Sequence, residues 1–174
     1  MIKSFNNKIP EIAKSAFVSE AAYVVGDVKI GKNSSIWPGA VLRGDLGCIT
    51  IGQNTAVEDN CVIHSGTPST PVGDVVIGSR VIIGHGAVVH SRKIGNNVLV
   101  GMNATILHDT KIGNYCLIAA GSLIKPGMQV PDNSFVTGIP GEISGPAPEQ
   151  LLWWTKEGLR HYSELAAAYK AEGL

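Results

Sequence analysis

The side chains best suited to chemistry are three histidines, His64, His85 and His90, which lie within 27 residues of one another. Imidazole is the commonest protein ligand for Zn²⁺ and similar divalent metals, and three histidines with one open position make a catalytic metal site. A single histidine on a turn is usually an ordinary polar surface residue. Three so close together predict a metal centre, provided that the fold brings them to one place.

The fold that must position them follows a six-residue repeat. Six matches neither the helical period of 3.6 nor the strand period of two. It indicates one short strand and one corner per hexad, with three hexads closing each coil and glycine at corners that require positive φ. The sequence therefore predicts an all-β solenoid, a parallel β-helix of roughly seven coils. The inward aliphatic positions are Ile12, Val18, Val24, Ile30, Ile36, Leu42, Ile51, Val57, Ile63, Ile77, Ile83, Val89, Ile94, Val100, Ile106, Ile112, Ile118, Ile124, Val130 and Val136.

The repeat is broken twice, within RGDLGCIT after Leu42 and within HSGTPSTPVGDVV after Ile63. Repeat proteins usually place their function where the repeat is interrupted. Corrected for the second break, Ile63 and Ile83 are expected one coil apart on the same face. His64 and His85 would then be vertical neighbours, and His90 would lie on the next face.

No single prism places three such side chains around one ion, but two prisms side by side can do so. The spacing therefore predicts a metal site shared between subunits, and three-fold symmetry would give three identical sites.

A helical pattern replaces the hexads near the C-terminus. From about Glu149 to Ala171, Leu151, Leu159, Tyr162, Ala166 and Tyr169 form one stripe at helical spacing. We expect residues 1–141 to form the β-helix and residues 147–172 to form a helix packed on it, in the same domain.

Composition narrows the class of protein. The 174 residues carry 14 basic and 14 acidic side chains, so no charge excess directs the chain to nucleic acid. No apolar run reaches the ~20 residues of a membrane span. The three cysteines, Cys48, Cys61 and Cys116, are widely spaced. They indicate reduced thiols and a cytoplasmic protein.

The Arg43-Gly44-Asp45 segment, the EDNCVIH run ending at His64, the GHGAVVH pair of His85 and His90, the hexads and the C-terminal helix together resemble the γ-class carbonic anhydrase family over essentially the whole chain. The resemblance implies a left-handed β-helix and a homotrimer with Zn²⁺, Fe²⁺ or Co²⁺ at each interface. It also implies that His64 and His90 come from one subunit and His85 from its neighbour. A metal-bound hydroxide would then convert CO₂ to bicarbonate.

The same resemblance assigns candidate catalytic residues. Glu58 stands where the family prototype has a glutamine that orients the hydroxide, and an ionised carboxylate can accept a hydrogen bond there but not donate one. Asp45 and Asp59 are candidates to hold Arg43 in an ion pair near the interface, where a purely structural contact is the alternative. Tyr162 could reach the site from the helix, or serve as a core tyrosine on the stripe.

Two positions depart from the family pattern. The prototype has a glutamate after its RGD-like segment and an acidic loop after its first histidine, which carry the proton shuttle; here Leu46 and an uncharged loop stand there. This predicts low anhydrase activity. A coenzyme A-linked thioesterase or acyltransferase on the same scaffold, or a non-catalytic metal-binding homologue, therefore remains an alternative.

Overall fold

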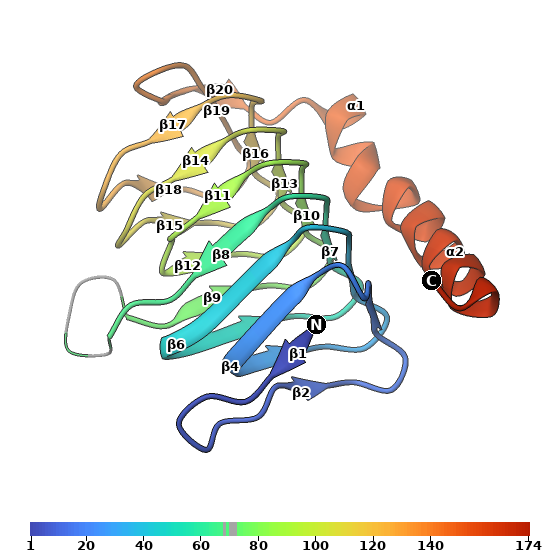
Figure 1. Cartoon of the computed structure of the whole chain (residues 1–174). Helices are drawn as coiled ribbons and strands as arrows, with labels where there is room; N and C mark the ends of the chain where they lie inside the picture. The colour runs from blue at the N-terminus through green and yellow to red at the C-terminus, as the bar shows by residue number, and fades with distance from the viewer. Residues whose placement is uncertain (68, 70–72) are drawn as a thin grey trace.

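The computed structural model describes residues 1–67, 69 and 73–174. The predicted fold is confirmed: the chain forms a left-handed parallel β-helix of about seven coils, and a C-terminal helical segment runs along one side (Figure 1). The second break of the repeat, after Ile63, forms a loop of which residues 68 and 70–72 lie outside the described residues.

The prism has three faces. The first face contains β1 (Ile2–Lys3), the first parts of β4 (Tyr23–Ile30) and β6 (Val41–Ile51), β8 (Val62–His64), β11 (Val88–Val89), β14 (Thr105–Ile106) and β17 (Leu123–Ile124). The second face contains β2 (Glu11–Ile12), the last parts of β4 and β6, β9 (Val75–Ile77), β12 (Lys93–Ile94), β15 (Lys111–Ile112) and β18 (Gln129–Val130). The strands of these two faces pair in parallel, and β4 and β6 carry the hydrogen bonding around the corner between them.

The third face is a separate sheet. It contains β3 (Phe17–Val18), β5 (Ser35–Ile36), β7 (Ala56–Val57), β10 (Ile82–Ile83), β13 (Leu99–Val100), β16 (Leu117–Ile118), β19 (Ser134–Thr137) and β20 (Glu142–Pro146). The strands β3 to β19 pair in parallel, and β20 then adds to β19 in the antiparallel direction.

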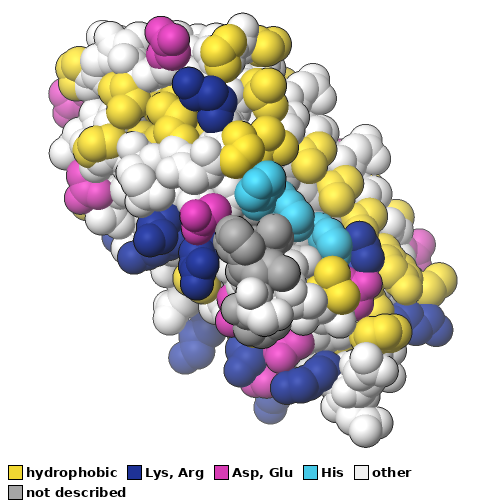
Figure 2. All heavy atoms as spheres, turned by 90° about the vertical axis from the view of Figure 1, so that its left-hand side faces the viewer, with side chains coloured by type: hydrophobic (Ala, Val, Ile, Leu, Met, Phe, Trp, Pro, Cys, Tyr) yellow, Lys and Arg dark blue, Asp and Glu magenta, His cyan; other side chains and the backbone are white. Residues whose placement is uncertain are grey.

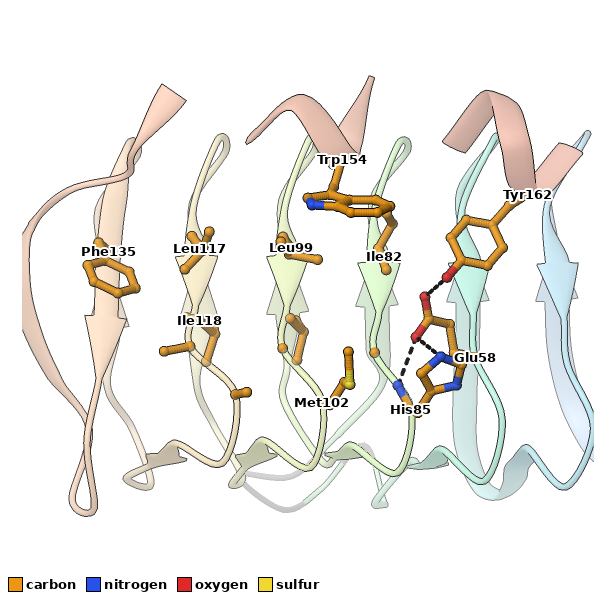
Figure 3. Close-up of a pocket in the computed structure, with 15 residues that line it drawn as sticks. Glu58, Ile82, His85, Leu99, Met102, Leu117, Ile118, Phe135, Trp154 and Tyr162 are labelled. Carbon is orange, nitrogen blue, oxygen red and sulfur yellow. Dashed lines mark hydrogen bonds and ion pairs between the residues drawn. The ribbon is translucent and has the colours of Figure 1, made fainter. Parts of the chain in front are cut away.

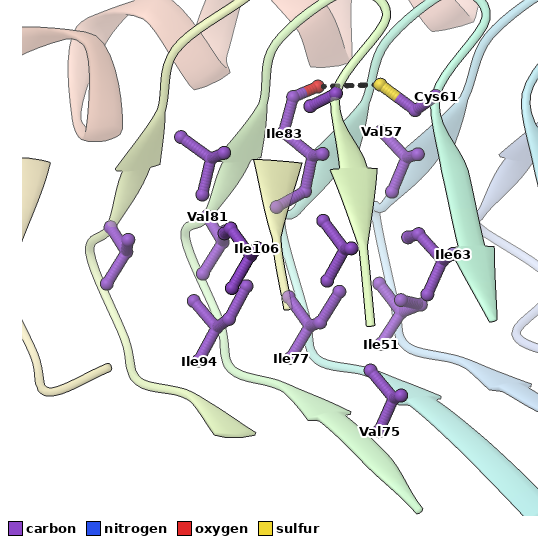
Figure 4. Close-up of a cluster of buried hydrophobic side chains, with 14 of the residues drawn as sticks. Ile51, Val57, Cys61, Ile63, Val75, Ile77, Val81, Ile83, Ile94 and Ile106 are labelled. Atoms are coloured by element: carbon purple, nitrogen blue, oxygen red, sulfur yellow. Dashed lines mark hydrogen bonds between the residues drawn. The ribbon is translucent and has the colours of Figure 1, made fainter. Parts of the chain in front are cut away.

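The core is a ladder of aliphatic side chains inside the prism, and part of it is drawn in Figure 4. The hexad residues Ile36, Ile63, Ile83 and Ile106 are completely buried. Each stacks on its equivalent in the next coil, because the parallel registers pair inward residue with inward residue, as at Ile63 and Val89. The six-residue period therefore translates directly into the core.

The glycines that follow the aliphatic residues serve a different purpose from the one predicted. Gly31, Gly52, Gly78 and Gly95 do not have positive φ, whereas several corner asparagines such as Asn97 do. A Cβ on any of these glycines would instead clash with backbone atoms of the coil above. They permit the close stacking of coils, and asparagine, which tolerates the left-handed region, supplies many of the turns.

The C-terminal segment consists of α1 (Glu149–Leu152), a 3₁₀ turn η1 (Trp153–Thr155) and α2 (Glu157–Glu172). The continuous helix predicted from sequence is thus interrupted, at a point where the buried Thr155 donates its hydroxyl to the Leu152 carbonyl at 2.8 Å. The side chain of Leu151 lies outside the described part of the structure.

Helix α2 covers the N-terminal half of the third face. Tyr162, Ala166 and Tyr169 pack against Phe17 and Trp37, with ring centroids 5.2 Å apart between Trp37 and Tyr169. Leu159 packs farther along, on Ala56 and Ile82.

The outward rows of the other two faces differ sharply. The first face presents Tyr23, Val41, Val62, Val88, Thr105 and Leu123 in register. The second face presents Glu11, Lys29, Thr50, Val76, Lys93, Lys111 and Gln129. Because no described element packs on the first face, it is an apolar row without a cover within one chain.

Cys48, Cys61 and Cys116 are free thiols. Cys61 is a core residue whose burial raises its pKa to about 12, so it is inert as a nucleophile. None of the helices among the described residues has the length and hydropathy of a membrane-spanning segment. The cytoplasmic location expected from the cysteines stays a prediction.

Candidate metal centre and active site

The histidine register differs from the one predicted. Ile63 pairs with Val89, so His64 and His90 are the vertical neighbours, and Val57 pairs with Ile83, which places His85 above Asp59. The expectation that His64 and His85 share a face was wrong. Ile63 and Ile77 are 14 residues apart, and the coil uses this stretch as a single hexad of six with the other eight thrown out as a loop.

The corrected register creates two corners. The His64 corner, between the first and second faces, holds His64 and His90. The His85 corner, between the third and first faces, holds Glu58, Asp59 and His85. The apolar first face separates them, and Figure 2 shows histidine side chains in a row beside apolar and basic groups on the side bearing the loop.

His64 and His90 form a stacked pair. Their ring centroids are 5.3 Å apart and their planes differ by 10°. Nε2 of His90 is buried and has no hydrogen-bond partner among the described residues. A buried polar atom without a partner is rare and costly, so this nitrogen has the properties of a free ligand atom.

Burial, and then the proximity of His64, His108 and Arg43, lowers the pKa of His90. A lowered pKa keeps the imidazole neutral at physiological pH, which leaves a lone pair available for a metal.

Arg43 and Asp45 hold His64 from the other side. Nη1 of Arg43 donates to Asp45 at 2.7 Å, and Nη2 lies 3.2 Å from Nδ1 of His64. A guanidinium only donates, so Nδ1 accepts and Nε2 donates to Asp45 at 3.1 Å. Asp45 therefore competes with any metal for Nε2.

The RGD segment permits this arrangement because its middle residue is glycine. The backbone of Gly44 lies against Asp27 and Gly26 of β4, so that a Cβ at Gly44 would clash with the Asp27 carbonyl. Burial opposes ionisation of Asp45, but hydrogen bonds from Arg43 and His64 outweigh it and lower the pKa of this carboxyl.

At the other corner, two carboxylates clamp His85. Nε2 lies 3.1 Å from Glu58 and Nδ1 lies 2.9 Å from Asp59. The backbone N–H of His85 also donates to Glu58 at 2.9 Å. The His85 side chain is 48% exposed, which leaves it accessible to a neighbouring molecule.

Glu58 is almost completely buried, with 4% of its surface exposed, and Tyr162 of α2 donates its hydroxyl to it (Figure 3). Burial and then the hydrogen bond to Glu58 raise the pKa of Tyr162, which keeps the phenol protonated and donating. The helix thus fixes the orientation of the Glu58 carboxylate.

The structure brings the predicted residues into two groups, and the predicted pairing of Arg43 with Asp59 is absent within one chain. Within one chain Asp45 is the partner of Arg43, whereas Asp59 faces His85. The Arg43–His64 contact and the Asp59–His85 pair were missed by sequence reasoning. Both follow from the register, which the sequence would have revealed had the second break been counted as one hexad.

Within one chain the three histidines do not meet. Among the described residues, no group of three His, Cys, Asp or Glu side chains is arranged to hold a metal ion. The donor chemistry nonetheless suits a divalent metal, because the stacked pair offers an unpartnered ring nitrogen and the third imidazole is exposed at another corner.

Comparison with known proteins identifies the family. Residues 93–126 match the model described as bacterial transferase hexapeptide, six repeats. A protein of Methanocaldococcus jannaschii named "Probable carbonic anhydrase" is 43% identical over 164 residues, covering 91% of this chain and 99% of that protein. The chain belongs to the γ-class carbonic anhydrase family.

Other similar proteins show that membership of this family does not by itself define the activity. Gamma carbonic anhydrase 1 of Arabidopsis thaliana is 34% identical over 168 residues, which cover 95% of this chain but 61% of that protein. The crystal structure of a hexapeptide transferase family protein from Anaplasma phagocytophilum is 32% identical, covers 97% of both chains and has a TM-score of 0.88. The proteins similar to this chain thus carry both anhydrase and transferase names.

Proposed function

We propose that the chain is a metal-dependent carbonic anhydrase that hydrates CO₂ to bicarbonate at sites between the subunits of a homotrimer. The observation that carries the proposal is the division of the histidines between two corners. His64 and His90 stack with one ring nitrogen unpartnered, and His85 projects from the other corner, out of their reach within one chain.

The outward rows support the assembly. The uncovered apolar first face lies between the two histidine corners. Burying that row against a second copy would remove apolar surface from water. It would also bring the His85 corner of one subunit toward the His64 corner of the next. Closed three-fold symmetry would repeat the contact three times.

The histidines would hold Zn²⁺, Fe²⁺ or Co²⁺. When bound, such a metal acts as a Lewis acid that generates a nucleophile from water at neutral pH. Asp59 accepts the Nδ1 proton of His85, which would leave Nε2 as the metal ligand once it turns away from Glu58, 3.1 Å from it in the single chain. Arg43 and Asp45 also fix the ring of His64, but Asp45 accepts from its Nε2, so a metal would have to displace Asp45 from this nitrogen.

Glu58 supplies a hydrogen-bond acceptor next to His85. Its carboxylate is buried and receives a hydrogen bond from Tyr162, so its orientation is fixed. It can therefore accept a hydrogen bond from a substrate hydroxyl without moving. The exposed Leu46 stands where a shuttle acid is expected, and we propose that proton export limits turnover.

The second candidate is a coenzyme A-linked thioesterase or acyltransferase. It is favoured by the structural similarity to a hexapeptide transferase and by the pairing of His85 with Asp59, which would orient a general base. That chemistry requires a histidine free of metal.

The deciding experiment measures metal content, CO₂ hydration and acyl-CoA hydrolysis on one anaerobic preparation, before and after chelation. The proposal expects about one metal per chain and CO₂ hydration that is lost with the metal. Acyl-CoA hydrolysis that survives chelation, without CO₂ hydration, would favour the second candidate.

A further inference from the structure

A cavity of about 390 Å³ runs along the third face where α2 no longer covers it. Its floor is a row of outward side chains in register, Ile82, Leu99, Leu117 and Phe135, which belong to four successive coils (Figure 3). Successive coils lie ~4.8 Å apart, so the row is on the order of 14 Å long. The volume lies in the range typical of small-molecule sites.

The remaining walls are apolar as well. Trp154 of η1 lies over the row, and Met102 flanks it on the opposite side. Trp154 can occupy this place because Gly158 leaves room for it: a Cβ there would come within 2.7 Å of the indole Cε3. The cavity is therefore long, narrow and hydrophobic along most of its length.

One end of the cavity is polar. Glu58, His85 and Tyr162 meet there, and they are the ionisable side chains among its described lining residues. The hydroxyl of Tyr162 and the backbone N–H of His85 are already donated to Glu58. Nε2 of the His85 side chain also lies 3.1 Å from Glu58. In the metal-free protein, what the end still offers is acceptor capacity on Glu58, which favours a head group that donates a hydrogen bond and disfavours a carboxylate.

We propose that this groove binds a linear aliphatic chain with a neutral or cationic hydrogen-bond-donating head. The head lies at Glu58 and the tail runs over Leu99 and Leu117 toward Phe135. The tail-binding wall comes from the third face and η1, so binding of the tail does not rest on the proposed CO₂ chemistry, whereas the head shares Glu58 with the proposed active site.

The test is calorimetric titration of the purified protein with n-alkanols from 1-butanol to 1-octanol, and with n-alkanoates of equal length. Burial of one methylene is worth about fourfold in affinity, so the dissociation constant should fall by about that factor per carbon. On chelated protein, alkanoates should bind more weakly than alkanols of equal length, because no metal on His85 is then present to attract a carboxylate. Treatment with a chelator should leave the alkanol series unchanged, which separates this result from failure of the metal proposal.

Two substitutions test how far along the groove the bound chain extends. Leu117→Trp should stop the gain in affinity at a shorter chain than in the wild type, and Leu99→Trp at a shorter chain still. Val76→Trp, on the exposed second face, is the matched control and should leave the series unchanged. Circular dichroism checks that each variant is folded.

The proposal would be overturned by a wild-type protein that binds none of the alcohols, as expected if a second copy fills the groove. It would equally be overturned by affinities that do not depend on chain length, by alkanoates that bind the chelated protein as well as alkanols do, or by folded Leu99→Trp and Leu117→Trp variants with the wild-type length profile.

Discussion

The two histidine corners are built from the same hexads but hold their imidazoles in opposite ways. At the His64 corner, the rings stack on each other, and one buried ring nitrogen has no partner among the described residues. At the His85 corner, both ring nitrogens face carboxylates, and the ring is 48% exposed. At the His64 corner a ring nitrogen of His90 lacks a partner, whereas the His85 corner exposes an imidazole whose orientation is fixed by two carboxylates.

The comparison shows that the two corners have complementary properties within one chain. Burying Nε2 of His90 without a hydrogen-bond partner is unfavourable. The His85 ring, held by Glu58 and Asp59, is exposed and adds little buried surface to its own chain. A metal shared between the corners of two subunits would give Nε2 of His90 a partner and would give the exposed His85 ring a function. The predictions below test this complementarity, from the largest expected effect to the smallest.

Single substitutions at either corner should abolish metal binding. His64→Ala and His85→Ala should each lower bound metal by at least about tenfold, because a three-ligand site loses one ligand. His161→Ala removes an exposed histidine of α2 and serves as the matched control. Plasma emission spectrometry of dialysed protein measures the effect; a His85→Ala protein that keeps its metal would remove that corner from the site.

Restoring an acid should speed turnover. Leu46 is exposed beside Asp45, so Leu46→Glu adds a proton carrier without disturbing the core. A positioned acid–base group contributes typically about 10²-fold or more. We expect kcat for CO₂ hydration to rise in weak buffer and to become less sensitive to added imidazole, with kcat/KM nearly unchanged. A wild-type kcat that ignores buffer concentration would show that proton export does not limit the reaction.

Removing the hydroxyl at the His85 corner should cost stability. Tyr162→Phe leaves the buried Glu58 carboxylate without one of its donors, and hydrogen bonds to charged groups contribute about 1.5–3 kcal/mol. Urea unfolding at fixed protein concentration measures the loss. Tyr169→Phe, on the same helix, should change the unfolding free energy by less than about 0.5 kcal/mol; equal effects of the two substitutions would contradict a specific role for the hydroxyl.

The smallest effect concerns acid stability at the His64 corner. The folded pKa of Asp45 is lowered, so its stabilisation is fully present above the unfolded value of about 4 and is lost as the pH falls through the folded value. Arg43→Ala should flatten the fall in unfolding free energy between about pH 5 and pH 2. Arg160→Ala, which removes an exposed ion pair with Glu164 on α2, is the control and should leave the slope unchanged. An unchanged slope for Arg43→Ala as well would show that the Arg43–Asp45 pair does not contribute to acid stability.

Arg43→Ala should also weaken the proposed trimer, because it removes a charge whose carboxylate partner, Asp45, would stay at the interface. Light scattering at low protein concentration detects this. An unchanged trimer would mean that Arg43 lies at its periphery.

The fold could be read from the sequence because the hexad is local. Each inward aliphatic, such as Ile83 or Ile106, is identified by residues within six positions of it, and the core follows. The histidine register could not be read so directly. The 14 residues from Ile63 to Ile77 suit either two hexads and a remainder or one hexad and a loop, and only pairing across coils decides between them.

The details of the candidate site depended on that register. Asp59 faces His85 because both follow inward residues that pair, Val57 and Ile83, by two positions. The glycine positions were recognised, but their reason, close stacking rather than positive φ, required the neighbouring coil.

The measurement that tests the account most directly is metal content in mixed trimers of His64→Ala and His85→Ala chains. In any mixed trimer, one interface joins an intact His64 corner to an intact His85 corner, so metal should return to about one third of the sites. Differently tagged chains allow mixed trimers to be isolated and verified. Recovery of metal to this level is the predicted result. Verified mixed trimers that hold no more metal than the pure variants would contradict a site divided between the two corners.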